Sequence, residues 1–224
     1  MKKMKIKLAL TDMDGTAVCY ENSRFQASWD ALGTAAGVRR EYDQLMNKYI
    51  HQPQLYSTWF NANVELLEGK EVSPIASQLL PPPYTSGFLE MCAFLKSQGC
   101  ILGMVSGGID LVAKQIQAEA GLDFVIVNEL HQQAGKFTGT GIVQVSLDGK
   151  GSIVEKIIPQ MGLRKEEVVY FGDSWNDIPA WKKVGLPLGV NIKLPECYKH
   201  VKDYFPNFRG ALAYLQETVF VERE

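Results

Sequence analysis

The sequence predicts an α/β protein, in which a parallel sheet carries helices on both faces and a small helical segment is inserted near the N-terminus. Two observations predict this class. Between residues 100 and 190, short apolar runs alternate with amphipathic helical patterns, which is typical of α/β sheets. One further apolar run, residues 5–10, is separated from the others by residues 22–80, where no strand pattern occurs. A chain of 224 residues is long enough for such a core and an insert.

Five apolar runs have the length and the Val, Ile and Leu content of buried parallel strands. Each run ends abruptly in small or polar residues. Ligands bind outside the carboxyl ends of the strands in open α/β sheets, so we expect a site among these residues. The predicted strands are residues 5–10 (KIKLAL), 100–105 (CILGMV), 123–127 (DFVIV), 167–171 (EVVYF) and 185–190 (GLPLGV).

Helical patterns fill the intervals between these strands. Residues 109–121 place apolar side chains on one face, and Gly121 ends the pattern. Residues 151–162 repeat the pattern, although Pro159 is expected to kink that helix or to end it early. Residues 135–146 combine glycines with alternating Val and Ile, which predicts a small hairpin.

Residues 22–80 form the predicted insert, which contains three or four helices. Apolar residues recur there at helical spacing, as in residues 42–49. Ser73-Pro74 marks the start of the last helix, because proline suits the first helical position. The predicted domains are a core of residues 1–18 and 82–224 and a helical cap of residues 19–81.

The composition excludes several function classes. The chain is 46% hydrophobic and 21% charged, as in soluble globular proteins, and its net charge of −2 lacks the basic excess that nucleic-acid binding needs. No apolar run approaches the roughly 20 residues of a membrane span. The start, MKKMKIKLAL, is interpreted as a strand because no small-residue cleavage site follows it. The four cysteines are scattered without CxxC spacing, which suggests neither a zinc site nor a disulfide framework, so we expect a reduced, cytoplasmic protein. The expected state of association is a monomer or a homodimer.

Four polar clusters follow the predicted strands or begin helices. Each has an ordinary structural reading on its own, as an Asx turn, a strand-to-helix turn, a surface lysine or a helix cap. Together they offer carboxylates, which Mg²⁺ prefers, and a lysine with backbone donors, which suit a phosphoryl group. The clusters are DMDGT at 12–16, SGG at 106–108, Lys150, and GDSWND at 172–177.

These clusters resemble the motifs of the haloacid dehalogenase superfamily, in their order along the chain. DMDGT is similar to the first motif, VSGG to the second, DGKGSIVEKI to the third and GDSWND to the fourth. Within the superfamily the chain resembles the phosphoserine phosphatase branch, which carries a helical cap after the first motif. The resemblance runs from Ile6 to about Leu215. It implies a Rossmann-like core and Mg²⁺-dependent hydrolysis of a small phosphorylated metabolite.

The resemblance also implies a division of labour between two carboxylates that would otherwise repel each other. Asp12 is expected to attack phosphorus and form an aspartyl-phosphate, while Asp14 protonates the leaving alcohol and then activates water. Mg²⁺ beside Asp12 would help to keep the two pKa values apart. Lys150 is expected to balance the charge of nucleophile and phosphate. Lys156 is the rival for this role, but it lies more than a turn into its helix.

The remaining site residues are likewise implied by the resemblance. They fall into three groups, which hold the metal, orient its waters or Lys150, and bind phosphate. The expected metal ligands are Asp12, the backbone carbonyl of Asp14, and Asp173. The residue expected to orient the waters or the lysine is Asp177. The expected phosphate-binding groups are Ser106, the N–H of Gly107, and Asn176.

The leaving group of the substrate is less defined by the sequence. Glu21 falls where phosphoserine phosphatases carry a glutamate that meets the substrate's amino group, which favours an amino-bearing phosphomonoester; a solvated hinge glutamate is the alternative. The family's cap arginine, which holds the substrate carboxylate, maps approximately to residues 61–63, Asn-Ala-Asn. No arginine occurs between Arg40 and Arg164, and asparagine replaces a bidentate arginine poorly.

Aromatic residues leave a second substrate class open. Tyr56, Trp59, Phe60 and Trp175 would suit a cationic amine through cation–π contacts, as in phosphoethanolamine or phosphocholine, whereas simple packing of the cap is the alternative for the first three. A phosphotransferase would use the same aspartyl-phosphate. A catalytically idle phospho-ligand sensor would not need nucleophile and acid together, and dehalogenase chemistry would not need Asp14. A transport ATPase is excluded by the missing spans.

Overall fold

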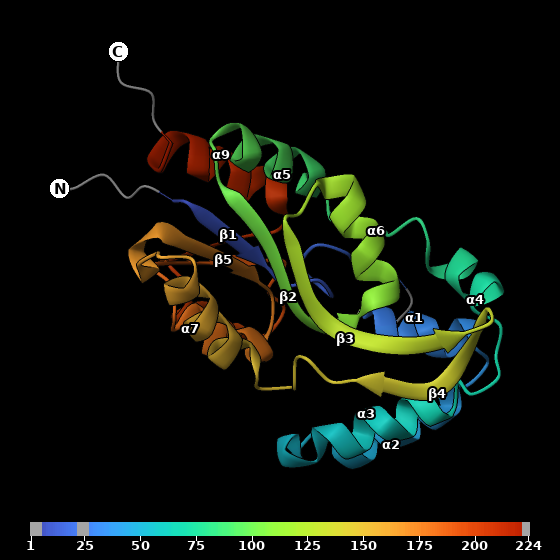
Figure 1. Ribbon diagram of the computed structural model, residues 1–224. Helices are drawn as coiled ribbons and strands as arrows, with labels where there is room; N and C mark the ends of the chain where they lie inside the picture. The colour runs from blue at the N-terminus through green and yellow to red at the C-terminus, as the bar shows by residue number, and fades with distance from the viewer. Residues whose placement is uncertain (1–5, 22–26, 221–224) are drawn as a thin grey trace.

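The computed structural model describes residues 6–21 and 27–220. Among these residues, seven strands form one sheet in the order β4-β3-β2-β1-β5-β6-β7 (Figure 1). All neighbours pair in parallel except β3 and β4, which are antiparallel. The five predicted strands are present, and the short edge strand β7 is an addition. The strands are β1 (Leu8–Thr11), β2 (Ile101–Ile109), β3 (Phe124–Gln133), β4 (Lys136–Ile142), β5 (Val168–Gly172), β6 (Leu186–Val190) and β7 (Asp203–Phe205).

Helices cover both faces of the sheet, as predicted. Alternate residues of β1 face opposite layers, because side chains alternate along a strand. Ala9 packs in the core beneath α5 (Phe88–Ser97), α6 (Asp110–Ala120) and α9 (Phe208–Thr218). Leu8 and Leu10 pack with α7 (Lys150–Gln160) and α8 (Ile178–Trp181) on the other face. Short 3-10 helices connect some of these elements: η2 (Lys165–Glu167), η3 (Trp175–Asp177) and η4 (Pro195–His200).

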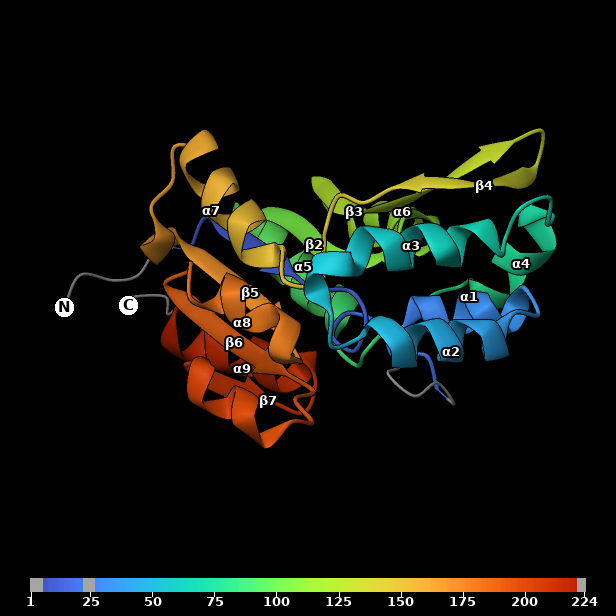
Figure 2. The same ribbon diagram turned by 90° about the horizontal axis from the view of Figure 1, so that it is seen from below.

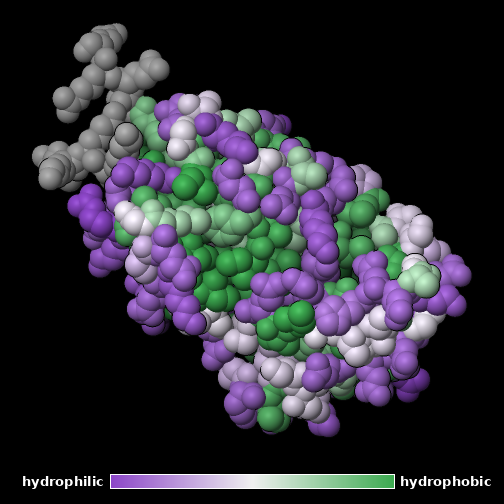
Figure 3. Space-filling view, in the orientation of Figure 1, coloured by the Kyte–Doolittle hydropathy of each residue, from purple (hydrophilic) through white to green (hydrophobic). Residues whose placement is uncertain are grey.

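The second face is covered less completely than the first. Figure 3 shows apolar surface gathered in the middle of the molecule, where β2 and β3 lie in Figure 1. Ile101 at the start of β2 is 38% exposed, and Phe124 and Ile126 of β3 are only partly buried against the α7 core. None of the described helices has the length and the apolar character needed to cross a lipid bilayer.

The predicted helical insert is present and lies at one end of the molecule, beyond the carboxyl edge of the sheet (Figure 2). Its helices pack on one another, α1 against α2 and α4, and α2 against α3. Pro53–Leu55 (η1) leads into α3 as a 3-10 turn. The helices are α1 (Ser28–Ala35), α2 (Arg39–Tyr49), α3 (Tyr56–Glu65) and α4 (Val72–Leu79).

The hairpin predicted within residues 135–146 is wrong in its pairing. These residues supply one strand, β4, and its partner is the far end of β3. Ala134 and Gly135 both have positive φ, 50° and 77°, so the chain turns there as in tight two-residue hairpins. The sequence hides this turn, because alanine is unusual at positive φ.

The β3–β4 hairpin joins the sheet to the insert. The Phe137 carbonyl of β4 accepts a hydrogen bond from the Gly69 N–H (2.9 Å), and the Phe137 N–H donates to the Lys70 carbonyl (3.0 Å). Val72 N–H donates to the Gly135 carbonyl (2.9 Å). The exact boundary between core and cap at residues 18/19 and 81/82 stays a prediction, and parts of both predicted domains, residues 1–5 and 22–26, lie outside the described residues.

Candidate active site

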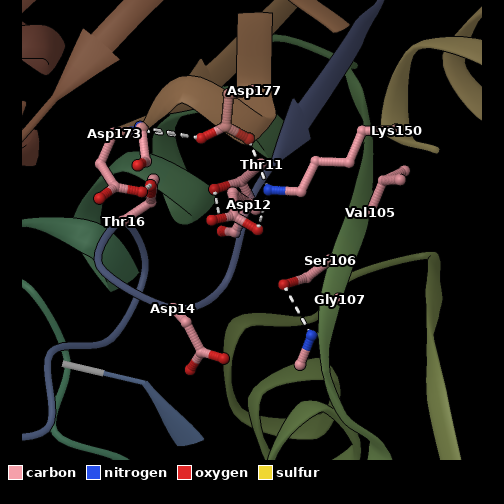
Figure 4. A network of polar contacts seen from close by, with 12 residues as sticks. Thr11, Asp12, Asp14, Thr16, Val105, Ser106, Gly107, Lys150, Asp173 and Asp177 are labelled. Atoms are coloured by element: carbon pink, nitrogen blue, oxygen red, sulfur yellow. Dashed lines mark hydrogen bonds and ion pairs between the residues drawn. The ribbon is translucent and has the colours of Figure 1, made fainter. Parts of the chain in front are cut away.

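The carboxyl edge of the sheet collects the predicted site residues, because parallel strands end on the same side. Asp12 directly follows β1, Asp173 directly follows β5, and Ser106 lies near the end of β2. Lys150 is the first residue of α7 and points back toward the same place (Figure 4). Residues far apart in sequence thus meet in one buried cluster.

Lys150 is the centre of this cluster, and its side chain is 1% exposed. Its Nζ lies 2.7 Å from Asp12 Oδ1 and 2.6 Å from Asp177 Oδ1. Burial alone lowers the pKa of Lys150, but the charges of Asp12 and Asp177 outweigh burial and raise that pKa above its ordinary value. The rival Lys156 is exposed on α7. Of the two lysines, only Lys150 reaches Asp12.

Asp177 is held by donors on both carboxylate oxygens. Oδ1 accepts from Lys150 Nζ and from the Tyr170 hydroxyl at 2.9 Å. Oδ2 accepts from the backbone N–H groups of Asp173 (3.0 Å) and Ser174 (3.1 Å). Four donors leave this carboxylate little capacity for a metal ion. Asp177 therefore fixes Lys150 and the loop after β5.

Asp12 and Asp173 have the chemistry of a divalent metal site. Carboxylate oxygens of Asp12, Asp173 and Asp177 lie within 4.8 Å of one another, and hard cations such as Mg²⁺ prefer oxygen ligands. Burial raises the pKa of Asp12 to about 6, although Lys150 opposes this. Burial and the charges of Asp177 and Asp12 raise the pKa of Asp173 well above its ordinary value. Three carboxyl groups near the Lys150 ammonium group therefore carry an excess of negative charge that an added cation would neutralise.

Gly15 and Thr16 shape the place of Asp173. Thr16 Oγ1 donates to Asp173 Oδ1 at 3.1 Å. Gly15 has φ +82°, and a Cβ there would lie 2.5 Å from Asp173 Oδ2. Glycine is required at this position both for the backbone conformation and for the approach of the carboxylate.

Asp14 lies apart from Lys150 in different surroundings. Its Oδ1 accepts from Ser28 N–H and its Oδ2 from Ser28 Oγ, both at 2.8 Å. Burial raises the pKa of Asp14 to about 7, and the hydrogen bonds from Ser28 oppose the rise. A carboxyl group with this pKa holds and releases a proton near neutral pH, as an acid–base catalyst must.

The glycine-rich segment of β2, where its pairing with β3 shifts register, is built around Ser106, which is 2% exposed. Its Oγ accepts from the Gly108 N–H at 3.2 Å. A Cβ on Gly108 would lie 2.2 Å from Met13 Cε and 2.7 Å from Asp14 Oδ2, so the loop approaches the first motif closely. The Gly107 carbonyl accepts from Trp29 Nε1 at 3.0 Å.

A cavity of about 610 Å³ opens between this cluster and the helical insert. It has the size of small-molecule sites in proteins. Asn176 lines it, and Asn176 Oδ1 is buried without a hydrogen-bond partner among the described residues. Glu21 is exposed and is not among the described residues that line the cavity, so the structure does not bring it to the site. The lining also includes Asp12, Asp14, Ser106, Gly107, Lys150, Asp173, Tyr56, Trp59, Phe60 and Trp175.

The family model for haloacid dehalogenase-like hydrolases matches residues 6–185. The chain belongs to this family. Among curated relatives, the phosphoserine phosphatase of Methanocaldococcus jannaschii is 31% identical over 86% of this chain and 89% of its own. That of Archaeoglobus fulgidus is 31% identical over 88% of this chain and 55% of its own. A solved phosphoserine phosphatase, an analogue of its phospho-aspartyl intermediate, aligns at 28% identity with a TM-score of 0.78 over 95% of this chain and 100% of that chain.

These matches confirm the expected haloacid dehalogenase-type phosphatase of the phosphoserine phosphatase-like branch. Some residues of the site were not predicted from the sequence. Ser28 and Trp29 reach the site from the insert, and no motif marks them. Asn128 also belongs to the site, because its Nδ2 donates to the Gly107 carbonyl. Unlike Ser28 and Trp29 it carried a usable signal, since this polar residue directly follows the apolar run of residues 123–127.

Proposed function

We propose that the protein is a Mg²⁺-dependent phosphomonoesterase that acts through an aspartyl-phosphate on Asp12, with phosphoserine as its leading substrate. The observation that carries the proposal is the contrast between two neighbouring aspartates. Asp12 is ion-paired with Lys150, whereas Asp14 is held by Ser28 with a pKa of about 7. The difference in partners assigns the roles, because the ammonium group beside Asp12 favours the ionised form that a nucleophile needs, whereas Asp14 can hold a proton near neutral pH. The named activity of the relatives supports phosphoserine.

The first step forms a bond between an Asp12 carboxylate oxygen and phosphorus and breaks the bond from phosphorus to the leaving oxygen. Asp14 gives its proton to that oxygen, so an alcohol departs. In the second step Asp14 takes a proton from water, which attacks phosphorus. This attack releases the Asp12 carboxylate and inorganic phosphate.

The metal would be held by Asp12, the Asp14 backbone carbonyl and Asp173, which fits the acidic surroundings of these groups. When bound, Mg²⁺ would neutralise phosphoryl oxygens. Asp177 would keep Lys150 and the Asp173 backbone in place through the hydrogen bonds described above. These assignments leave Asp177 outside the ligand set.

The phosphate would be bound on its other side by Ser106, the Gly107 N–H, Asn176 and Lys150. The Asn176 side chain supports this, since Asn176 lines the cavity and its amide NH₂ group can donate to a phosphoryl oxygen. Lys150 lies against Asp12 and so would meet the charge of both the nucleophile and the phosphate.

A second candidate, a phosphorylated amine without a carboxylate, is favoured by one observation. No arginine is among the described residues that line the cavity, while aromatic rings of Trp29, Trp59 and Phe60 are. A carboxylate would therefore lack its usual bidentate partner, and an ammonium group would find π faces. Glu21 stays a predicted amine contact that the cavity lining does not support.

The test is steady-state phosphate release with Mg²⁺ across phosphoserine, phosphoethanolamine, phosphocholine, sugar phosphates and nucleotides, with Asp12→Asn as the blank. Preference for phosphoserine supports the leading substrate, and preference for the amines supports the second candidate. Phosphate transferred to added alcohols in place of water would indicate a phosphotransferase. Equal binding of phosphate esters by wild type and Asp12→Asn, without turnover by either, would favour a sensor and refute the enzymatic function.

We place the protein in the cytoplasm, acting alone or as a homodimer on a small metabolite.

A further inference from the structure

The Gly107 carbonyl carries an unusual concentration of donors. Asn128 Nδ2 donates to it at 2.9 Å and Trp29 Nε1 at 3.0 Å, and the Tyr56 hydroxyl lies at a longer 3.4 Å. Two well-placed donors already use both lone pairs of a carbonyl oxygen. Trp29 and Tyr56 come from the helices α1 and α3 of the insert, whereas Asn128 comes from β3.

Asn128 is itself fixed on all sides. It is fully buried, and its Oδ1 accepts from the N–H groups of Gln144 (2.9 Å) and Val145 (3.0 Å). Its Nδ2 also donates to the Tyr56 hydroxyl at 2.9 Å. The amide therefore has a definite orientation and cannot turn without losing several hydrogen bonds.

The same peptide unit connects this carbonyl to the catalytic cluster. The Gly107 carbonyl is bonded to the Gly108 nitrogen, whose N–H donates to Ser106 Oγ at 3.2 Å. Because Oγ accepts this hydrogen bond, the Ser106 proton is left to donate to another acceptor, either the Asp12 carboxylate or a phosphoryl oxygen. Donors on a carbonyl also polarise the N–H of the same peptide and strengthen its hydrogen bond.

We infer that Trp29, Tyr56 and Asn128 are positioning residues that orient the Ser106 hydroxyl for phosphate binding, through the peptide between Gly107 and Gly108. The inference rests on the proposed function. It gives the insert a second task besides covering the cavity, because two of the three donors belong to it. The full set of donors on the Gly107 carbonyl is present only while α1 and α3 are seated on this segment of β2.

The same turn of α1 also binds Asp14, the proposed acid. Ser28 holds Asp14, and the next residue, Trp29, holds the Gly107 carbonyl. Seating of α1 therefore places the leaving-group acid and the phosphate-binding hydroxyl together. Packing alone would not need the indole N–H, since the Trp29 ring already packs against Tyr42 in a tilted arrangement (6.1 Å between ring centroids) and against Phe60 edge-on (5.7 Å).

The test measures inorganic phosphate binding by calorimetry, with Mg²⁺, in Trp29→Phe. This change keeps a ring for packing and removes the N–H. We expect phosphate affinity to fall between about 2- and 12-fold, the range for one lost hydrogen bond. Tyr56→Phe should weaken it less, because its contact is longer. Trp181→Phe is the matched control: this buried indole of α8 has an Nε1 without a hydrogen-bond partner among the described residues, and it does not line the cavity, so phosphate affinity should not change.

A double-mutant cycle decides whether the effect passes through Ser106. In a Ser106→Ala background, Trp29→Phe should cause no further loss of phosphate affinity. The same loss in both backgrounds, or an unchanged affinity in Trp29→Phe alone, would overturn the inference. Failure of the proposed function would show as absent turnover. The phosphate affinities of the variants could still be compared by calorimetry in that case, so the two failures are distinguishable.

Discussion

Replacing Lys150 with methionine removes the ammonium group that pairs with Asp12 and Asp177 in a buried cluster of acids. Asp12 and Asp177 are 2% and 0% exposed, and each lies within 2.7 Å of the lysine. Breaking a buried ion pair by removing one partner costs about 3–5 kcal/mol, since the remaining charge is left uncompensated. One kcal/mol shifts the melting temperature of a chain of this size by about 2–4 °C, so we expect a drop of roughly 6–20 °C.

Calorimetry and denaturant titration at neutral pH measure this loss, and Lys156→Met is the control. Lys156 lies on the same helix but is exposed, so its loss should stay within about 0.5 kcal/mol. The Lys150→Met deficit should shrink in acid, where Asp12, whose pKa is already raised to about 6, becomes neutral. Adding Asp177→Asn to Lys150→Met should lower the free energy of unfolding by less than the sum of the two single changes. A melting temperature within about 2 °C of wild type would refute the reasoning.

The remaining predictions concern Asp14, Asp173 and their neighbours. Ser28→Ala removes a hydrogen bond that lowers the pKa of Asp14, so the alkaline fall of kcat/KM, where the acid loses its proton, should move to higher pH; an unmoved limb would contradict the assignment. Asp173→Asn removes a charge that repels Asp12 and Asp177, so the free energy of unfolding of the metal-free protein should rise by about 0.5–2 kcal/mol. The rise in melting temperature that Mg²⁺ causes should disappear in the same variant. A loss of stability in the metal-free variant would count against mutual repulsion. Gly15→Ala places a Cβ against Asp173 at a positive φ, so it should lower the free energy of unfolding by about 1–2 kcal/mol. It should also weaken Mg²⁺ binding measured by calorimetry. Unchanged Mg²⁺ binding would mean that the Asp173 carboxylate moves freely.

The sequence was sufficient for the features that local chemistry marks. Asp12 and Asp173 directly follow apolar strands, and the sheet places the ends of parallel strands on one edge, so their meeting could be predicted. Lys150 could be preferred over Lys156 from its place at the helix start alone. The helical spacing of residues 42–49 likewise predicted α2.

Features that depend on tertiary contact could not be predicted. Ser28 and Trp29 look like ordinary residues of an amphipathic helix, and only the docking of α1 on the sheet brings them to Asp14 and Gly107. The partner of β4 was assigned wrongly because Ala134 adopts the positive φ that a glycine or asparagine would have signalled. Local propensity was overridden in both cases by packing elsewhere in the chain.

The central claim is that Asp12 becomes phosphorylated during turnover. The most direct measurement is a rapid acid quench of the Mg²⁺-loaded enzyme with radiolabelled phosphoserine, followed by digestion and mass spectrometry of the labelled peptide. The account predicts a label that hydroxylamine releases, as an acyl phosphate requires, located on Asp12 and absent from Asp12→Asn. Turnover at a normal rate in Asp12→Asn, or a label on any other residue, would contradict it.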